Sequence, residues 1–346
     1  MEDLKEELNK CLQRNVPFVF YRKPKSNIVK AIIQKDNSVS YFTDLSVSGF
    51  VFAPFDDRES SYFIPEEKSI NNTYSIKYRK NDSPLREIGY FNTAERRNYI
   101  EVVQTAIDII NNSEIQKIVT SRKETVEPNK INIFNTLEKL LYFYQQAFVY
   151  VWFHPLTGLW MGATPEILLE VNDNKFKTMA LAGTRSYEGT LQTNWGAKEI
   201  QEQQFVTDYI QLKLKGLEIN ISDPVTIRAG SLLHICSEIK GELTNSHELY
   251  SLIRTLHPTP AVCGTPKDNA KQFILNNENY DREYYTGFLG EIDSGTVTNL
   301  YVNLRCMKIN NTSINIYIGG GITKDSIPED EWKETCIKSA VMKRVL

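Results

Sequence analysis

The chain has 346 residues, of which 41% are hydrophobic and 24% are charged, and its formal net charge at pH 7 is −3. This composition is typical of a soluble globular protein with a substantial core, and the length allows one large domain or two ordinary ones. The small net charge gives no electrostatic footprint for nucleic acid. The N-terminus lacks a basic segment followed by an apolar one, and no apolar run is long enough to span a bilayer. We therefore expect a cytoplasmic protein without a membrane partner.

Cysteine and histidine usage argues against zinc and dithiol chemistry. The five cysteines are widely scattered and include no CxxC pair, and the four histidines include no HExxH motif. Zinc sites and dithiol catalysis depend on such spacings. We therefore expect reduced, mostly buried thiols.

The first third of the chain is predicted to hold strands between two helices. A short amphipathic helix is expected over residues 3–13, and apolar residues at helical spacing predict another over 94–112. Strands are expected at 18–23, 30–35, 48–55 and 61–65, bounded by Asn, Ser, Pro and Asp. The polar stretch at 66–97 is expected to be loop with some strand.

The middle of the chain mixes both kinds of element. The sequence predicts a strand at 114–127, a helix at 131–147 and consecutive antiparallel strands at 148–155, 158–165 and 166–172. It then predicts a strand at 175–185, a helix at 195–216, a strand-loop segment at 225–242 and helices near 246–256 and 267–276.

The C-terminal part is predicted to be strands closed by one helix. Strands are expected at 287–293, 298–309 and 313–320, with a turn at Asn310-Asn311 joining the last two. The final helix has Ser326 as its expected N-cap and Pro328 early in its first turn. Strands outnumber helices and mostly adjoin in sequence, so the predicted fold class is α+β with large antiparallel sheets.

Two pairs of glutamates carry the first functional hypothesis. Glu199 and Glu202 lie in one predicted helix, and Glu331 and Glu334 lie in another. Residues three apart share a helix face, so four carboxylates converge if the two faces meet. Like charges that close need a neutralising ion, and oxygen ligands alone suit Mg²⁺. The alternative is two solvated helix faces, with Glu334 and Lys338 as an ordinary ion pair.

Lys117 and Glu166 are candidates for proton transfer. Lys117 lies in an apolar strand, where an inward-facing amine loses solvation, so that its pKa falls and it can act as a base. Glu166 follows Pro165, and partial burial there raises the pKa of a carboxyl, which suits an acid. The alternatives are an outward-facing strand lysine and a solvated strand end.

Other polar residues lie inside strand patterns. An inward-facing Arg305 would be a good carboxylate clamp because its fork matches two oxygens. His234 fits a histidine whose hydrogen bonds are satisfied in the core. Gly319, Gly320 and Gly321 could let backbone N–H groups approach an anion, or could form a turn that needs positive φ.

A dozen ordered segments identify a family. They include GFVFAPFD, QKIVTSRKE, GATPEILLE, ALAGTR, KEIQEQQFV, HICSEIKGEL, LHPTPAVCGTP, DREYYTGFLGEID, YVNLRCMKI, IGGGI and EWKETCIKSAVM. From about residue 50 to the C-terminus the chain resembles the chorismate-utilising enzymes, most closely the isochorismate synthases. The resemblance implies a chorismate-binding enzyme fold, with large antiparallel β-sheets packed as a sandwich and helices on the outside. It also implies a single chorismate-binding domain over 1–346, with a core at 96–346 and an N-terminal part at 1–95.

The resemblance also implies roles for individual residues. In the family the two glutamate pairs hold Mg²⁺, which binds the ring carboxylate of chorismate; Glu202 and Glu334 match the direct ligands, and Glu199 and Glu331 match partners that act through water. Lys117 matches the general base that activates water for attack at C2, and Glu166 the general acid that protonates the hydroxyl leaving C4, giving isochorismate reversibly. The implied substrate-binding residues are Gly183, Thr184, His234, Ser237, Ala261, Tyr285, Arg305, Gly319, Gly321 and Lys338.

Details of the motifs favour one branch of the family. Aminodeoxychorismate synthases typically carry lysine where Ala182 stands, and salicylate synthases commonly carry threonine where Ala261 stands. Gln203 and Gln204 depart from the family, which often has His or Glu there, and Ser237 stands where Thr is common.

The alternatives are a lyase of the same fold, making salicylate or anthranilate, and a non-catalytic chorismate-binding subunit. We expect a monomer whose product feeds menaquinone or catechol siderophore synthesis.

Overall fold

A computed structural model describes residues 1–77, 93–128, 131–229, 232–244, 246–293 and 297–346. Its described strands form two nine-stranded sheets in which the paired strands are antiparallel. The first sheet holds, in spatial order, β14 (Gly264–Thr265), β6 (Lys117–Val126), β18 (Ile314–Ile322), β17 (Cys306–Ile309), β8 (Gly158–Thr164), β7 (Phe148–His154), β1 (Phe18–Arg22), β2 (Ile28–Gln34) and β5 (Ser69–Ser75).

The second sheet and the helices complete the fold. The second sheet holds, in order, β11 (Ile219–Ile221), β13 (Leu232–Glu242), β10 (Lys175–Ser186), β9 (Ile167–Asn172), β16 (Val297–Val302), β15 (Phe288–Ile292), β3 (Gly49–Ala53) and β4 (Tyr62–Pro65), while β12 (Val225–Ala229) pairs with β13. The described helices are α1 (Glu2–Arg14), α2 (Thr93–Asn111), α3 (Ile133–Phe143), α4 (Ala197–Lys213), α5 (Ser246–Leu256), α6 (Lys267–Asn277), α7 (Pro328–Lys343) and a short 3₁₀ turn, η1 (Glu66–Lys68).

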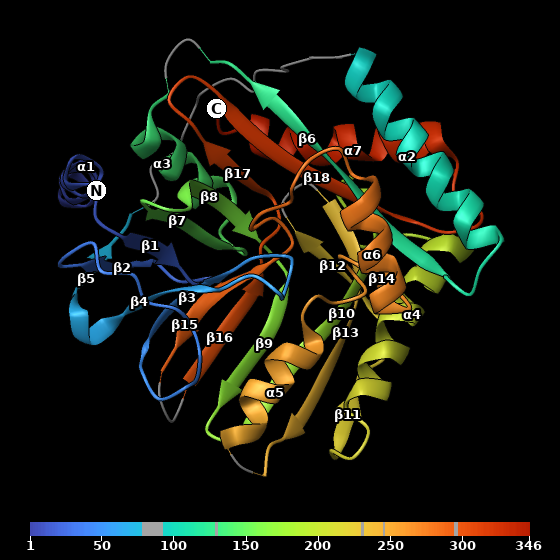
Figure 1. The fold of residues 1–346 in the computed structure, drawn as a ribbon, viewed down its shortest axis with the longest axis horizontal. Helices are drawn as coiled ribbons and strands as arrows, with labels where there is room; N and C mark the ends of the chain where they lie inside the picture. Colours follow the sequence, from blue (N-terminus) through green and yellow to red (C-terminus); the bar gives the residue numbers. More distant parts are fainter. Residues whose placement is uncertain (78–92, 129–130, 230–231, 245, 294–296) are drawn as a thin grey trace.

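Aromatic side chains hold the two sheets together as a sandwich. The rings of Phe148 and Tyr301, from opposite sheets, stack with centroids 4.3 Å apart, and those of Phe52 and Trp152 stack at 4.8 Å. Such offset stacking adds to the gain from burying large apolar surfaces. Helices lie on the outside, with α1 and α3 packed against the first sheet and α4 and α5 against the second (Figure 1). The predicted α+β sandwich is confirmed.

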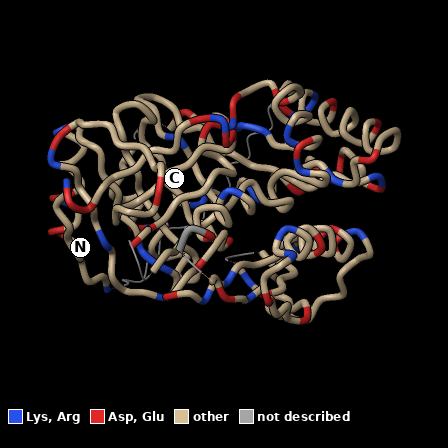
Figure 2. Tube along the Cα trace, turned by 60° about the horizontal axis from the view of Figure 1, so that its bottom comes forward, with Lys and Arg blue, Asp and Glu red and all other residues tan. Residues whose placement is uncertain are grey.

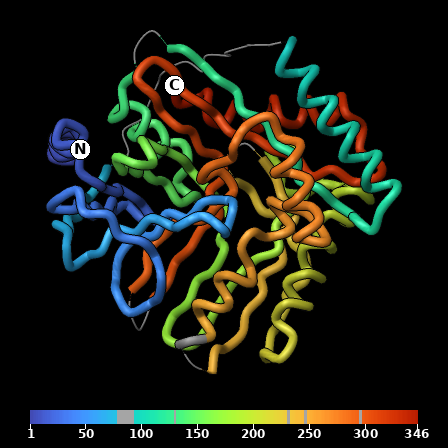
Figure 3. The backbone as a smooth tube through the Cα atoms, viewed as in Figure 1, coloured from blue at the N-terminus to red at the C-terminus, as the bar shows by residue number. Residues whose placement is uncertain are grey.

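The N-terminal residues are part of both sheets rather than a separate body. β1 pairs with β7 in the first sheet, and β3 pairs with β15 in the second. Strands far apart in sequence also adjoin at the other end of the molecule, where β6 and β18 run side by side over nine paired positions (Figure 3). The predicted helix over 94–112 is observed as α2, whereas much of the predicted loop at 66–97 lies outside the described residues.

Two of the places where the chain crosses between the sheets lie next to each other. β8 leads to β9 through Pro165 and Glu166, and β16 leads to β17 through Asn303, Leu304 and Arg305. The crossings are joined, since the Thr164 hydroxyl donates to the Val302 carbonyl and the Ala163 N–H to the Arg305 carbonyl. The prediction of one continuous strand over 298–309 is therefore wrong, because its two halves pair in different sheets.

The final helix starts later than predicted. Ile327, not Ser326, is the N-cap residue of α7, which begins at Pro328. The Ser326 hydroxyl instead accepts a hydrogen bond from the Thr323 N–H at 3.0 Å, which stabilises the turn before the helix. The predicted turn at Asn310-Asn311 does join β17 to β18.

Charged residues of both signs are spread over the described chain. Lysine and arginine are interspersed with aspartate and glutamate along the backbone trace (Figure 2). None of the helices in the described ranges has both the length and the apolar character needed to cross a bilayer.

Candidate active site

One cavity lies at the two crossings, where both sheets and two helices contribute to its walls. Its lining comes from β6 and β18 of the first sheet, from β10 and β13 of the second, and from α4 and α7. Thirteen of the sixteen predicted site residues line it: Lys117, Glu166, Gly183, Thr184, Glu202, His234, Ala261, Tyr285, Arg305, Gly319, Gly321, Glu334 and Lys338. Ser237, Glu199 and Glu331 do not.

Lys117 reaches the cavity from β6 and Glu166 reaches it from the crossing between β8 and β9, and burial shifts the pKa of both side chains. Only 1% of Lys117 is exposed, and this burial lowers the pKa of its amine although Glu202, whose carboxylate is 4.0 Å away, opposes the effect. Burial raises the pKa of Glu166 to about 8, against the opposing charges of Lys117 and Arg305. Both environments favour the neutral forms, an amine that can accept a proton and a carboxyl that can donate one. The solvated alternatives for these residues are wrong.

The glycines of β18 provide room for these side chains. Gly319, Gly320 and Gly321 all pair with β6 as extended strand residues, so the interpretation as a turn is wrong. A Cβ at Gly321 would lie 2.9 Å from Lys117 Cε and 3.0 Å from a carboxylate oxygen of Glu202. Only glycine therefore lets the amine and the carboxylate lie against this strand.

Two buried glutamates, Glu202 and Glu331, and the partly exposed Glu334 lie around the amine of Lys198. Its Nζ pairs closely with Glu331 and lies 3.8 Å from Glu202, while Glu334 pairs with Lys338 at 2.7 Å. Burial raises the pKa of Glu202 and of Glu331. It acts on Glu334 in the same direction, but the charge of Lys338 holds that pKa below its ordinary value. Oε2 of Glu331 is buried without a hydrogen-bond partner, so this cluster retains an unused acceptor.

The predicted convergence of four glutamates needs a correction. Glu199 lies on α4 beside Arg185, with 3.8 Å between carboxylate oxygen and guanidinium, rather than in the cavity lining. Lys198 stands among the other three, and the described ranges contain no group of three or more acidic, histidine or cysteine side chains arranged to hold a metal. The alternative of two solvated faces is also wrong, because Glu202 and Glu331 are buried.

Ser237 does not reach the cavity because of strand alternation. It is three residues from His234 on β13, and residues an odd number apart point to opposite faces of a strand. Its hydroxyl accepts a hydrogen bond of 3.0 Å from Gln203 Nε2, which also donates to Thr207. Gln203 and Ser237, two of the three departures from the family pattern, thus contact each other between α4 and β13.

The sequence of the chain matches a known protein family. The sequence profile described as "Chorismate binding enzyme" matches residues 30–346, which is most of the chain. The chain belongs to the chorismate-binding enzyme family. Chorismate carries two carboxylates, and the cationic side chains of Arg305 and Lys338 in the cavity lining suit such an anion.

Individual members of the family match over most of their length. The isochorismate synthase EntC of Escherichia coli (strain K12) is 28% identical over 312 residues, covering 84% of this chain and 79% of that protein. The isochorismate synthase MenF of Haemophilus influenzae is 29% identical over 298 residues, covering 81% and 69%. The crystal structure of DhbC from Bacillus anthracis superposes with a TM-score of 0.81 at 23% identity, covering 97% of this chain and 98% of that one. This structural similarity to DhbC establishes the fold.

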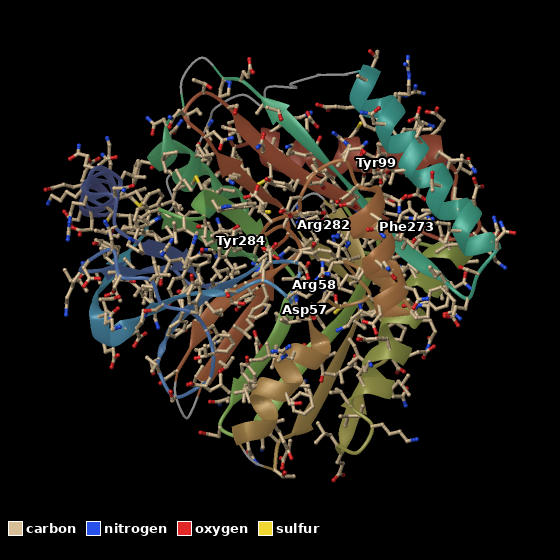
Figure 4. The ribbon with its side chains drawn as sticks, viewed as in Figure 1. Asp57, Arg58, Tyr99, Phe273, Arg282 and Tyr284 are labelled. Carbon is tan, nitrogen blue, oxygen red and sulfur yellow. The ribbon has the colours of Figure 1, made fainter. Side chains whose placement is uncertain are left out.

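Two charged residues of this chorismate-binding enzyme were missed in the sequence. Lys198 could have been noticed from its i,i+4 spacing to Glu202, although that spacing is common on solvated helices. Arg282 had no local signal. It is buried, pairs with Glu278 at 2.5 Å, and donates to the carbonyls of Val119 and Val262 (Figure 4). Arg282 thereby joins β6 to the loop that carries Ala261.

Replacing Arg282 with alanine should destabilise the fold by about 3–5 kcal/mol, because the charge of Glu278 is left buried without its partner. Denaturant unfolding would measure the loss. A double variant, Glu278→Gln with Arg282→Met, should recover part of it, since no isolated charge remains. Equal instability of the single and double variants would contradict this explanation.

Proposed function

We propose that this chorismate-binding enzyme is an isochorismate synthase, an isomerase that adds a hydroxyl to chorismate at C2 and removes the one at C4. The observation that carries the proposal is the placement of Lys117 and Glu166 in one cavity with opposite proton-transfer roles. The relatives named as isochorismate synthases, which match most of the chain, support it.

The proposed mechanism needs one base and one acid. Lys117, as the neutral amine, takes a proton from a water that attacks C2 of chorismate. The ring double bonds shift, and Glu166, as the protonated carboxyl, gives its proton to the hydroxyl leaving C4 as water. One water enters and one leaves, so the reaction is reversible and needs no further reactant.

The carboxylate cluster fits a divalent cation, and we propose Mg²⁺. The cluster offers only oxygen donors, and the unpaired Glu331 Oε2 is an acceptor that the protein itself leaves unused. Glu202 and Glu334, which line the cavity, would hold the ion, and Glu331 would support it. The ion would supply positive charge toward the ring carboxylate of the substrate.

Product identification tests the proposal. The protein incubated with chorismate and Mg²⁺ should form isochorismate without pyruvate, and it should form chorismate from isochorismate. Release of pyruvate with salicylate, or anthranilate in the presence of ammonia, would assign the chain to the lyases instead. Ala261 in the cavity lining supports the isomerase, because no hydroxyl stands at that position beside the reacting ring.

Glu166→Gln should stop turnover but allow chorismate to bind. With Glu166 as the acid, kcat/KM of the unmodified enzyme should fall above pH 8, since the pKa of about 8 marks the loss of the proton that the leaving hydroxyl needs. Initial rates from pH 6 to 10 would show this alkaline limb. Failure of the glutamine variant to bind chorismate would indicate a structural role.

We also propose that the enzyme acts as a cytoplasmic monomer. Large hydrophobic side chains exposed on the described surface, such as Leu156, Leu212 and Ile327, come from separate parts of the chain. Light scattering should give one chain mass of 39.9 kDa. The use of isochorismate, for menaquinone or for a catechol siderophore, depends on the enzymes that follow.

A further inference from the structure

Each ring nitrogen of His234 has one partner, and both partners border the cavity. Nδ1 lies 2.8 Å from the Gly183 carbonyl, and Nε2 lies 2.8 Å from Nη2 of Arg305. A guanidinium can only donate, so Nε2 has to accept the hydrogen bond from Arg305. The ring proton is therefore on Nδ1, where it donates to Gly183. The two partners together select one tautomer of the neutral ring.

The surroundings keep the ring neutral. Burial lowers the pKa of His234 to about 3, and the charges of Arg305 and Lys338 act in the same direction. Gly183 lies at an irregularity of β10, where the register with β13 shifts between Ala182 and Arg185. The ring thus joins this irregular part of β10 to the crossing that carries Arg305.

Arg305 itself is held in an uncommon conformation. Its φ of 47° is in the left-handed region, which side chains other than glycine rarely adopt and which recurs at functional sites. Its Nη1 donates to the Ala229 carbonyl at 2.9 Å, and its Nη2 donates to His234. These contacts use two of the five N–H groups of a guanidinium and leave the others for a ligand in the cavity.

We propose that His234 is a positioning residue for Arg305. Its Nε2 fixes the plane of the guanidinium, so that the remaining N–H groups are set to receive a carboxylate of the substrate, and its Nδ1 anchors the ring to Gly183. The proposal deepens the proposed function, because it takes chorismate as the ligand. It also revises the sequence interpretation: His234 has its hydrogen bonds satisfied, but both of its partners, Gly183 and Arg305, are site residues.

Two variants separate the two ring contacts. His234→Gln places a carbonyl oxygen near the position of Nε2 and can still accept from Arg305. His234→Asn reaches only the position of Nδ1 and can still donate to Gly183. Hydrogen bonds to charged groups are stronger than those between neutral groups, and the asparagine variant loses the one from Arg305. It should therefore bind chorismate roughly ten- to a hundredfold more weakly, whereas the glutamine variant should bind it only about threefold more weakly.

The measurement is chorismate binding by calorimetry in Mg²⁺-free buffer with a chelator, followed by KM and kcat with Mg²⁺. We expect the loss in His234→Asn to fall mainly on the Kd and KM. His154→Asn is the control, since His154 is buried away from the cavity lining. It should change thermal stability without changing the Kd. Chorismate binding can be measured whatever product the enzyme forms. A failure of the positioning proposal for His234 can therefore be told apart from a failure of the proposed isochorismate synthase function.

A double-variant cycle tests whether the ring acts through Arg305. Once Arg305→Ala has removed the guanidinium, adding His234→Asn should weaken chorismate binding by less than about threefold more. Fully additive losses would overturn the proposal, because they would mean that His234 contacts the substrate itself. Equal losses in the glutamine and asparagine variants would also overturn it, since a packing role does not distinguish the two ring positions.

Discussion

Replacing Lys117 with alanine is expected to lower kcat by roughly three orders of magnitude, within the usual range for removing a general base. The amine is buried, its pKa is lowered, and it lies in the same cavity as Glu166. Without it, the attacking water has no acceptor for its proton. Chorismate should still bind, because the cations at Arg305 and Lys338 remain. Fixed-time assays of isochorismate formation would measure the loss of turnover, and calorimetry would show whether chorismate binding is retained.

Lys123 offers a matched control on the same strand. It lies six residues further along β6, is half-buried, and has its amine 5.7 Å from the ring of Tyr280 rather than in the cavity lining. Lys123→Ala should keep nearly full turnover. A Lys117→Ala variant that also kept full turnover would remove the proposed base, and would revive the alternative of a chorismate-binding subunit without chemistry.

Most elements of the fold could be predicted because their patterns are local. The strands β7 and β8 are continuous apolar runs bounded by Pro155 and Pro165, and they are observed nearly where predicted. The break at Arg305 could not be predicted. Residues 298–309 keep strand-forming composition throughout, and only the partners show that β16 belongs to one sheet and β17 to the other. Such pairing is a non-local property.

The site shows the same division between local and non-local information. Lys117 and Glu166 were ambiguous as single residues, because the direction of a pKa shift depends on burial by segments far away in sequence. Family motifs identified them, and the structure adds their burial. The motifs did not indicate that Glu199 would face Arg185, or that Lys198 would lie among the other glutamates. Side-chain alternation along β13 could have excluded Ser237, since it lies an odd number of residues from His234.

Replacing Glu334 with glutamine should abolish most Mg²⁺-dependent activity, by on the order of a hundredfold or more, while the protein stays folded. The change keeps the side-chain volume but removes a negative charge from the cavity wall, where Glu334 and Glu202 face each other from α7 and α4. Glu202→Gln should behave alike. Calorimetric titration of each variant with Mg²⁺, beside the unmodified protein, gives a readout that does not depend on turnover.

Glu329→Gln is the matched control for this prediction, because Glu329 lies on the same helix in an exposed ion pair with Arg96 at 2.6 Å. Surface pairs of this kind contribute little, so this variant should keep both its metal affinity and its rate. Loss of affinity in Glu334→Gln and Glu202→Gln, but not in Glu329→Gln, would locate the ion between α4 and α7. Unchanged Mg²⁺ affinity in both cavity variants would mean that the carboxylates around Lys198 serve only as its counter-ions, and that the ring carboxylate of chorismate is held by the protein's own cations.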